Sequence, residues 1–175
     1  MAPRFPPTTE AYLRRTAEGN HGLDPNRLIF TDVAQSKDSY MGFIHCADLA
    51  LDTLQYNGHT SICDTLWAGV PVLTVPGERM AGRVGASLVC ALDCPELVCP
   101  TLAVYEHRAA WLATTAGQVE YSALRAKVQA NRKTAPLFDT HGWVHNAERL
   151  FVAMAERAAR GLLPEHIVVD DGPIL

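Results

Sequence analysis

The chain has 175 residues, of which 48% are hydrophobic and 19% are charged, and its formal net charge is −4 at pH 7. This composition is typical of a globular protein, and the length fits one domain or a large part of one. A negative chain lacks the basic surface that binds nucleic acid, so we expect no nucleic-acid partner. No apolar run approaches the ~20 residues of a membrane-spanning helix, and the N-terminus lacks the apolar stretch of a signal peptide.

The cysteines indicate a reducing compartment. Their odd number and the absence of a CxxC pair argue against a disulfide framework or a zinc ribbon, and we expect no metal. Cysteines that serve as small buried hydrophobic residues are common inside cells. We therefore expect an intracellular location, in the cytosol or nucleus, with an organelle matrix equally compatible. The five cysteines are Cys46, Cys63, Cys90, Cys94 and Cys99.

Short apolar runs alternate with longer segments of helical spacing. In chain order, the pattern predicts a helix over 9–17, a strand over 28–30, a helix over 36–47, a strand over 48–52, a helix over 60–68, a strand over 72–75, a helix over 79–92, a short strand over 96–99, and helices over 104–114, 121–132 and 141–160. Strands that alternate with helices indicate βαβ units, and strands that are apolar throughout indicate a sheet covered on both faces. The predicted fold class is therefore α/β, a Rossmann-like parallel sheet with helices on both faces.

Local signals mark some boundaries of these elements. Thr8 or Thr9 is a plausible N-cap of the first helix, Ser36 can cap the second, and Gly69 closes the helix over 60–68. No complete strand precedes the first helix, so we expect the chain to enter its fold part-way, with one or more strands missing. The last helix carries an apolar stripe that needs a covering surface, formed by Trp143, Ala147, Leu150, Phe151, Met154 and Ala158.

The segment 51–64 carries the most chemical information. It reads as a buried strand, a turn, and a helix start where His59, Thr60 and Ser61 stand in a row. A helix N-terminus offers unpaired N–H groups and the positive end of the helix dipole, which together favour a phosphate. Asp64 lies one turn further on, on the face of Thr60 and Ser61, where its carboxylate could accept hydrogen bonds from a ribose. The pattern is compatible with a nucleotide site, but a Thr-Ser pair at this position can also serve only as an N-cap.

The motifs from Leu51 to Leu88 resemble the donor-binding core of protein O-GlcNAc transferases. The matching motifs are, in order, LDT, NGHTS, a downstream Asp, LWAG, PVLT, PGE and RVGAS. The plant O-fucosyltransferases of the SPINDLY type share the frame but depart from it at the turn. Outside this core, residues 26–30 with Val33 and Ala34 resemble the family's uracil loop, and residues 136–139 resemble its C-terminal end. The resemblance covers approximately residues 4–166.

The resemblance implies the C-terminal lobe of a GT-B fold that binds UDP-GlcNAc between two lobes. Thr60 and Ser61 would hold the diphosphate, Asp64 the ribose, and His59 would border the sugar or phosphate. Ala34 and Lys37 would lie along the uracil, with Tyr40 stacking where the family usually has His. Ser61 stands where the family usually has a second Thr. The family needs no metal, and its catalytic His, its first lobe and its TPR repeats have no counterpart in this chain.

Four segments follow from this interpretation. Residues 1–8 form an N-terminal extension or truncated strand, 9–140 the nucleotide-sugar-binding lobe, 141–165 an amphipathic C-terminal helix, and 166–175 a tail. The first function hypothesis is the donor-binding half of an inverting transferase that acts on Ser or Thr of proteins and requires a missing catalytic lobe. The alternative is a non-catalytic structural subunit held in a larger protein assembly.

Overall fold

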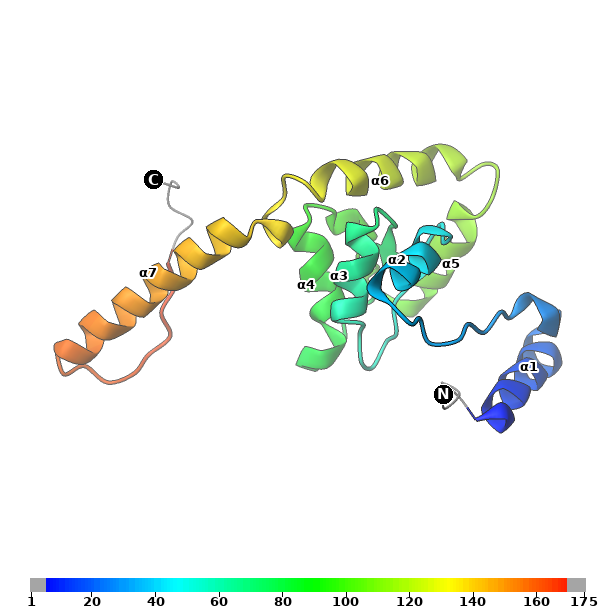
Figure 1. Ribbon diagram of the computed structural model, residues 1–175, viewed down its shortest axis with the longest axis horizontal. Helices are drawn as coiled ribbons and strands as arrows, with labels where there is room; N and C mark the ends of the chain where they lie inside the picture. The colour runs from blue at the N-terminus through cyan, green and yellow to red at the C-terminus, as the bar shows by residue number, and fades with distance from the viewer. Residues whose placement is uncertain (1–5, 170–175) are drawn as a thin grey trace. The chain divides into compact units, whose positions relative to one another are not determined.

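The protein is described by a computed structural model that covers residues 6–169 and forms two compact units. One unit ends at Phe43 and the other begins at Ile44. Figure 1 shows the helices and the short sheet that make up these units. The four segments predicted from the sequence stay a prediction, and residues 1–5 and 170–175 of the first and last segments lie outside the described residues.

The first unit contains helix α1 (Pro7–His21), the 3-10 turn η1 (Pro25–Arg27) and most of helix α2 (Lys37–His45). The predicted caps at Thr8 or Thr9 are wrong, because α1 already begins at Pro7, whose fixed φ suits the first helical position. The cap at Ser36 is confirmed, since its hydroxyl oxygen accepts a hydrogen bond of 3.1 Å from the Ser39 amide.

The predicted strand over 28–30 is wrong. These residues follow η1 in an irregular conformation, and the Ile29 side chain is 84% exposed. The described part of the first unit holds no other strand, so these residues have no ladder partner within their unit. An apolar run becomes a strand only when another strand can pair with it, which local sequence does not reveal.

The second unit is built on a short parallel sheet. Strand β1 (Ala50–Leu51) pairs with β2 (Val72–Leu73), with Ala50 opposite Val72 and Leu51 opposite Leu73. A parallel bridge between Thr74 and Val98 extends the sheet toward a third segment. The strands predicted over 48–52 and 72–75 are therefore present but shorter. The strand predicted over 96–99 is reduced to that bridge because a 3-10 turn, η3 (Pro95–Leu97), precedes it.

Helices cover this sheet: α3 (Thr60–Trp67), α4 (Val84–Ala91) after the 3-10 turn η2 (Met80–Gly82), α5 (Leu102–Leu112) and α6 (Gln118–Asn131). The last helix, α7 (Thr140–Ala159), follows the 3-10 turn η4 (Pro136–Phe138) and has no buried residue. The boundaries agree with the sequence prediction to within a few residues, except that the predicted helix start at 79 is wrong because η2 precedes α4. Gly69 follows α3 with a φ of 80°, a left-handed conformation that glycine adopts at little cost. The predicted helix stop is thereby confirmed.

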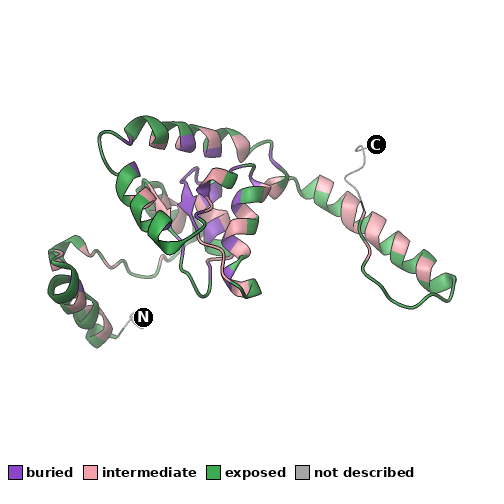
Figure 2. Ribbon diagram, turned by 180° about the vertical axis from the view of Figure 1, so that it is seen from behind, coloured by how far each residue is buried: buried purple, intermediate pink, exposed green. Residues whose placement is uncertain are grey.

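The core lies around the sheet of the second unit, as the buried positions in Figure 2 show. Val72 and Leu73 are both almost fully buried, although successive strand residues point to opposite faces. Both faces of β2 are therefore covered, as predicted. The helices contribute Leu66, Val89 and Val128 to the same core. Among residues 6–169, no helix is both long and apolar enough to cross a bilayer.

Candidate functional site

The candidate site begins where β1 leads through a loop into α3. Thr60 and Ser61 are the first two residues of α3, and both are exposed. The residue before them, His59, stands at the N-cap position but makes no capping hydrogen bond with its side chain. Asp64 lies one turn further along and is half-buried. The structure thus brings four of the seven predicted site residues together at one helix N-terminus.

A buried carboxylate holds the loop that leads to this helix. Asp52 follows β1 directly and is only 8% exposed. Its Oδ1 accepts hydrogen bonds of 2.9 Å from the amides of Thr53 and Gly58, and its Oδ2 accepts one of 2.7 Å from the Thr74 hydroxyl. Because Gly58 lies two residues before Thr60, the carboxylate connects both ends of the loop to the neighbouring strand.

Asn57 joins this loop to the loop that follows β2. Its amide Nδ2 donates to the Thr53 carbonyl at 2.6 Å, and its Oδ1 accepts from the Gly85 amide at 3.0 Å. Its backbone N–H donates to the Ala81 carbonyl at 2.8 Å. Asn57 is fully buried, so these bonds are shielded from water. The two strand-to-helix loops therefore form one connected surface at the carboxyl ends of the strands, where ligands of open α/β sheets bind.

His59 has an unusual environment within this loop. Its ring stacks on Tyr56, with ring centroids 4.8 Å apart and an interplanar angle of 17°. Its Nε2 is buried and has no hydrogen-bond partner among the described residues. A buried polar atom of this kind normally has a partner. The hydrogen-bonding capacity of this buried atom is therefore unmet within the part of the chain that the structure describes.

The three remaining predicted residues lie in the first unit. Lys37 begins α2, and its Nζ lies 5.3 Å from the centroid of the Tyr40 ring. Ala34 lies in the irregular segment before α2 and is half-buried. Lys37 and Tyr40 therefore contact each other through a cation–π interaction. Thr60, Ser61 and Asp64 belong to the other unit.

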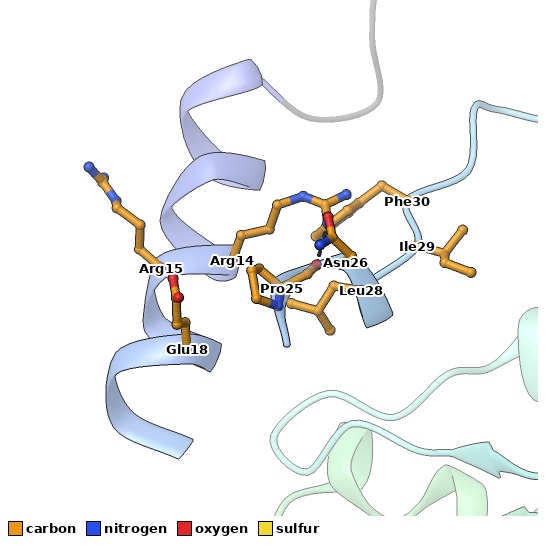
Figure 3. Close-up of a pocket in the computed structure, with 8 residues that line it drawn as sticks. All are labelled: Arg14, Arg15, Glu18, Pro25, Asn26, Leu28, Ile29 and Phe30. Carbon is orange, nitrogen blue, oxygen red and sulfur yellow. Dashed lines mark hydrogen bonds between the residues drawn. The ribbon is translucent and has the colours of Figure 1, made fainter. Parts of the chain in front are cut away.

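A separate hollow in the first unit lies between α1 and the segment 25–30 (Figure 3). The Arg14 guanidinium extends toward that segment, where it donates to the Pro25 carbonyl and lies 5.1 Å from the centroid of the Phe30 ring. It also forms a salt bridge of 2.9 Å with Glu10. Arg14 is thus already engaged by its own unit, and its role there is to fix the segment against α1.

The apolar stripe of α7 is partly covered by the chain that follows it. Residues 162–167 return along the helix, held by Arg157, which donates to the Leu163 carbonyl at 2.6 Å and pairs with Glu165. Trp143 and Phe151 nevertheless stay 71% and 65% exposed. Among the described residues, no cluster of three or more His, Cys, Asp or Glu side chains is arranged to hold a metal ion.

The residues that support the site are not predicted by the sequence pattern. In that pattern Asp52, Asn57 and Thr74 are only parts of a strand, a turn and another strand. The available signal was a carboxylate and an amide placed where the chain was predicted to be buried, since such groups require partners. The partners themselves are distant in sequence, as the bond between Asp52 and Thr74 illustrates.

Known proteins resemble this chain over most of its length. The family model described as glycosyl transferase family 41 matches residues 2–147. The chain is 40% identical over 167 residues, 95% of its length, to an Arabidopsis thaliana protein named as a probable UDP-N-acetylglucosamine–peptide N-acetylglucosaminyltransferase, SEC. It is 38% identical over 164 residues, 94% of its length, to the UDP-N-acetylglucosamine–peptide N-acetylglucosaminyltransferase of Caenorhabditis elegans.

A solved structure agrees with these sequence matches. The K341M mutant of the Thermobaculum terrenum O-GlcNAc transferase superposes with a TM-score of 0.72 and 30% identity, over 88% of this chain and 29% of that one. The predicted α/β fold of the O-GlcNAc transferase lobe is thereby confirmed. The chain spans only 17% of the Arabidopsis relative and 14% of the nematode relative. On the extent of these matches, the chain belongs to glycosyl transferase family 41.

Proposed function

We propose that this chain is the donor-binding part of a protein O-GlcNAc transferase and that the start of α3 binds the UDP of UDP-GlcNAc. The observation that carries the proposal is the exposed Thr60–Ser61 pair at a helix N-terminus, with Asp64 half-buried one turn later. The relatives named above support the ligand, since the names of both curated relatives specify UDP-N-acetylglucosamine.

Each residue has a distinct role in this proposal. The hydroxyls of Thr60 and Ser61 and the first amides of α3 donate to the diphosphate, which the helix dipole also favours. Asp64 accepts hydrogen bonds from the ribose hydroxyls, and His59 borders the sugar or phosphate. The sequence resemblance assigns Ala34, Lys37 and Tyr40 of the first unit to the uracil, with the Tyr40 ring as the stacking surface.

The chemistry assigned to this chain concerns the leaving group. Inverting transfer of GlcNAc to a Ser or Thr hydroxyl releases UDP, whose developing negative charge needs hydrogen-bond donors aimed at it. The start of α3 supplies such donors. We assign no general base to this chain, so the transferase reaction requires a catalytic lobe and a protein acceptor from outside these 175 residues.

A non-catalytic structural role is the second candidate. The observation that favours it is the exposed apolar stripe of α7, where Trp143 and Phe151 remain largely uncovered. Large exposed apolar surfaces are typical of contacts with another protein surface. Nucleotide affinity distinguishes this role from the donor-binding role, because a purely structural subunit has no need to bind UDP. Both roles fit a reducing intracellular compartment, with which the five free cysteines are compatible.

Calorimetric titration with UDP tests the donor-binding role. We expect saturable binding by the wild-type chain and at least about tenfold weaker binding by Thr60→Ala/Ser61→Ala and by Asp64→Ala, since a hydrogen bond to a charged group contributes about 1.5–3 kcal/mol. Ser122→Ala removes an exposed hydroxyl from α6 and serves as the control with unchanged affinity. Equal affinities for all four proteins would refute the site assignment.

A further inference from the structure

We propose that Asp52 is a positioning residue that sets the affinity of the α3 N-terminus for the donor nucleotide by holding Gly58. This inference rests on the proposed donor site. Asp52 itself is buried beneath the loop, whereas the residues assigned to the nucleotide lie on the exposed helix start. Its influence on the nucleotide must therefore pass through the loop backbone.

The hydrogen bonds of Asp52 fix the loop at both ends. Oδ1 accepts hydrogen bonds from the amides of Thr53 and Gly58, each at 2.9 Å, so that a single oxygen joins residues near both ends of the loop. Oδ2 accepts a hydrogen bond of 2.7 Å from the Thr74 hydroxyl, which anchors the carboxylate to the segment that continues β2. A buried carboxylate is stable only when its oxygens are satisfied in this way.

The position of the carboxylate is tightly limited by Gly85. An ideal Cβ placed on Gly85 would lie 2.3 Å from Oδ2 of Asp52 and 2.6 Å from the Thr74 hydroxyl oxygen. Because Gly85 has no side chain, the backbone of α4 can pack directly against the Asp52–Thr74 pair. With α4 on one side and β2 on the other, the carboxylate has little room to move, and neither has the amide it holds.

The position of Gly58 in turn determines the position of Thr60 and Ser61 at the start of α3. Gly58 packs so closely on α3 that an ideal Cβ there would lie 2.5 Å from the Ser61 hydroxyl oxygen and 3.0 Å from Cγ1 of Ile62. Any shift of Gly58 is therefore transmitted to the first turn of α3. Misplacement of binding groups by about 1 Å is enough to weaken their action strongly.

The test compares Asp52→Ala with Asp52→Asn in the full chain. Asparagine keeps an oxygen for the amides of Thr53 and Gly58, and its NH₂ can donate to the Thr74 hydroxyl, so it should preserve the loop. Alanine removes all three bonds. Thr74→Val keeps the shape of residue 74 and removes only the bond to Oδ2, which provides a milder variant if Asp52→Ala does not fold. Val128→Ala, a fully buried position on α6, controls for a general loss of stability.

Two quantities are measured on each variant, well below its unfolding temperature. Amide hydrogen exchange over residues 58–63 reports the order of the helix start without any ligand, and UDP titration reports affinity. We expect Asp52→Ala to accelerate exchange over 58–63 and to weaken UDP binding at least about tenfold. Thr74→Val should have the same two effects to a smaller extent. Asp52→Asn should keep exchange and UDP affinity close to those of the wild-type chain. Val128→Ala should lower the unfolding temperature and leave both quantities unchanged.

The failures of the two proposals are distinguishable. Wild-type exchange rates over 58–63 in Asp52→Ala, or in Thr74→Val if alanine does not fold, would overturn the positioning role. The positioning role would also be overturned if Asp52→Asn lost as much UDP affinity as Asp52→Ala. It would be overturned as well if Val128→Ala accelerated hydrogen exchange over 58–63 and weakened UDP binding in the same way. If the wild-type chain binds no UDP, the donor assignment fails, and the inference about affinity fails with it, even where the exchange data still show that Asp52 orders the loop.

Discussion

Gly85 and Asp52 are in direct contact, and the contact leaves no space for a side chain on Gly85. An ideal Cβ on Gly85 would approach Oδ2 of Asp52 to 2.3 Å, closer than real Cβ atoms come to any neighbour. Gly85 is therefore required in α4 for a packing reason, although glycine within a helix is normally unfavourable. The position joins α4 to the polar network beneath the α3 N-terminus.

Gly85→Ala should destabilise the protein. The added methyl group forces Asp52 or Thr74 to move, and overpacking of this kind costs about 1–3 kcal/mol. The free energy of unfolding from urea denaturation measures the effect. Gly19→Ala is the matched control, because Gly19 is also within a helix but an ideal Cβ there meets nothing within 4 Å. That substitution should be neutral or stabilising, and an equal loss in both variants would contradict the packing argument.

Leu66→Ala should remove much of the stability of the second unit. Leu66 is fully buried on α3 within the core that includes Val72 and Leu73. Truncation of a buried leucine leaves a cavity and costs about 2–5 kcal/mol. Leu163→Ala is the control, since Leu163 is 81% exposed and its loss should change the unfolding free energy by no more than about 0.5 kcal/mol. Comparable losses at the two positions would show that the core is elsewhere.

Alkaline pH should destabilise the protein through Tyr105. Burial, followed by the nearby charges of Asp52 and Cys99, raises the pKa of the Tyr105 phenol from 10.0 to about 12. Its hydroxyl donates to the Asp52 carbonyl at 3.0 Å, a bond that ionisation would break. Because the pKa is raised in the folded state, the stabilisation is fully present below pH 10 and is lost as the pH rises through about 12.

Tyr105→Phe isolates this effect from the other groups that titrate at high pH. Between about pH 8 and pH 11, the wild-type protein should lose on the order of 1 kcal/mol more unfolding free energy than the phenylalanine variant. Urea denaturation at the two pH values provides the comparison. An identical pH dependence of the two proteins would mean that Tyr105 ionises as easily in the folded state as in the unfolded chain.

The helices of this protein were predictable from local sequence, whereas the sheet and the polar network were not. Helical periodicity and Gly69 located α3, and the position of Thr60 and Ser61 at its start followed directly. The apolar run at 28–30 had the composition of a strand, but strand formation depends on a partner that local sequence does not specify. Composition alone therefore overestimated the extent of the sheet.

The same distinction applies to the site. Thr60, Ser61 and Asp64 are close in sequence and share a helix, so their proximity could be predicted from helical spacing. The residues that hold the loop are connected across 22 residues between Asp52 and Thr74 and across 28 between Asn57 and Gly85. Such contacts depend on how strands and helices pack, which the folded chain reveals and the pattern of residues does not.

The most direct test of the account is an NMR titration of the isotope-labelled chain with UDP. If the start of α3 binds the nucleotide, the largest saturable changes in amide chemical shift should fall on residues 58–64, and they should disappear in Thr60→Ala/Ser61→Ala. The shifts of α7 should stay constant and serve as the internal control. Absence of any saturable change, or changes centred on α7 instead, would contradict the claim that this chain carries a donor-nucleotide site.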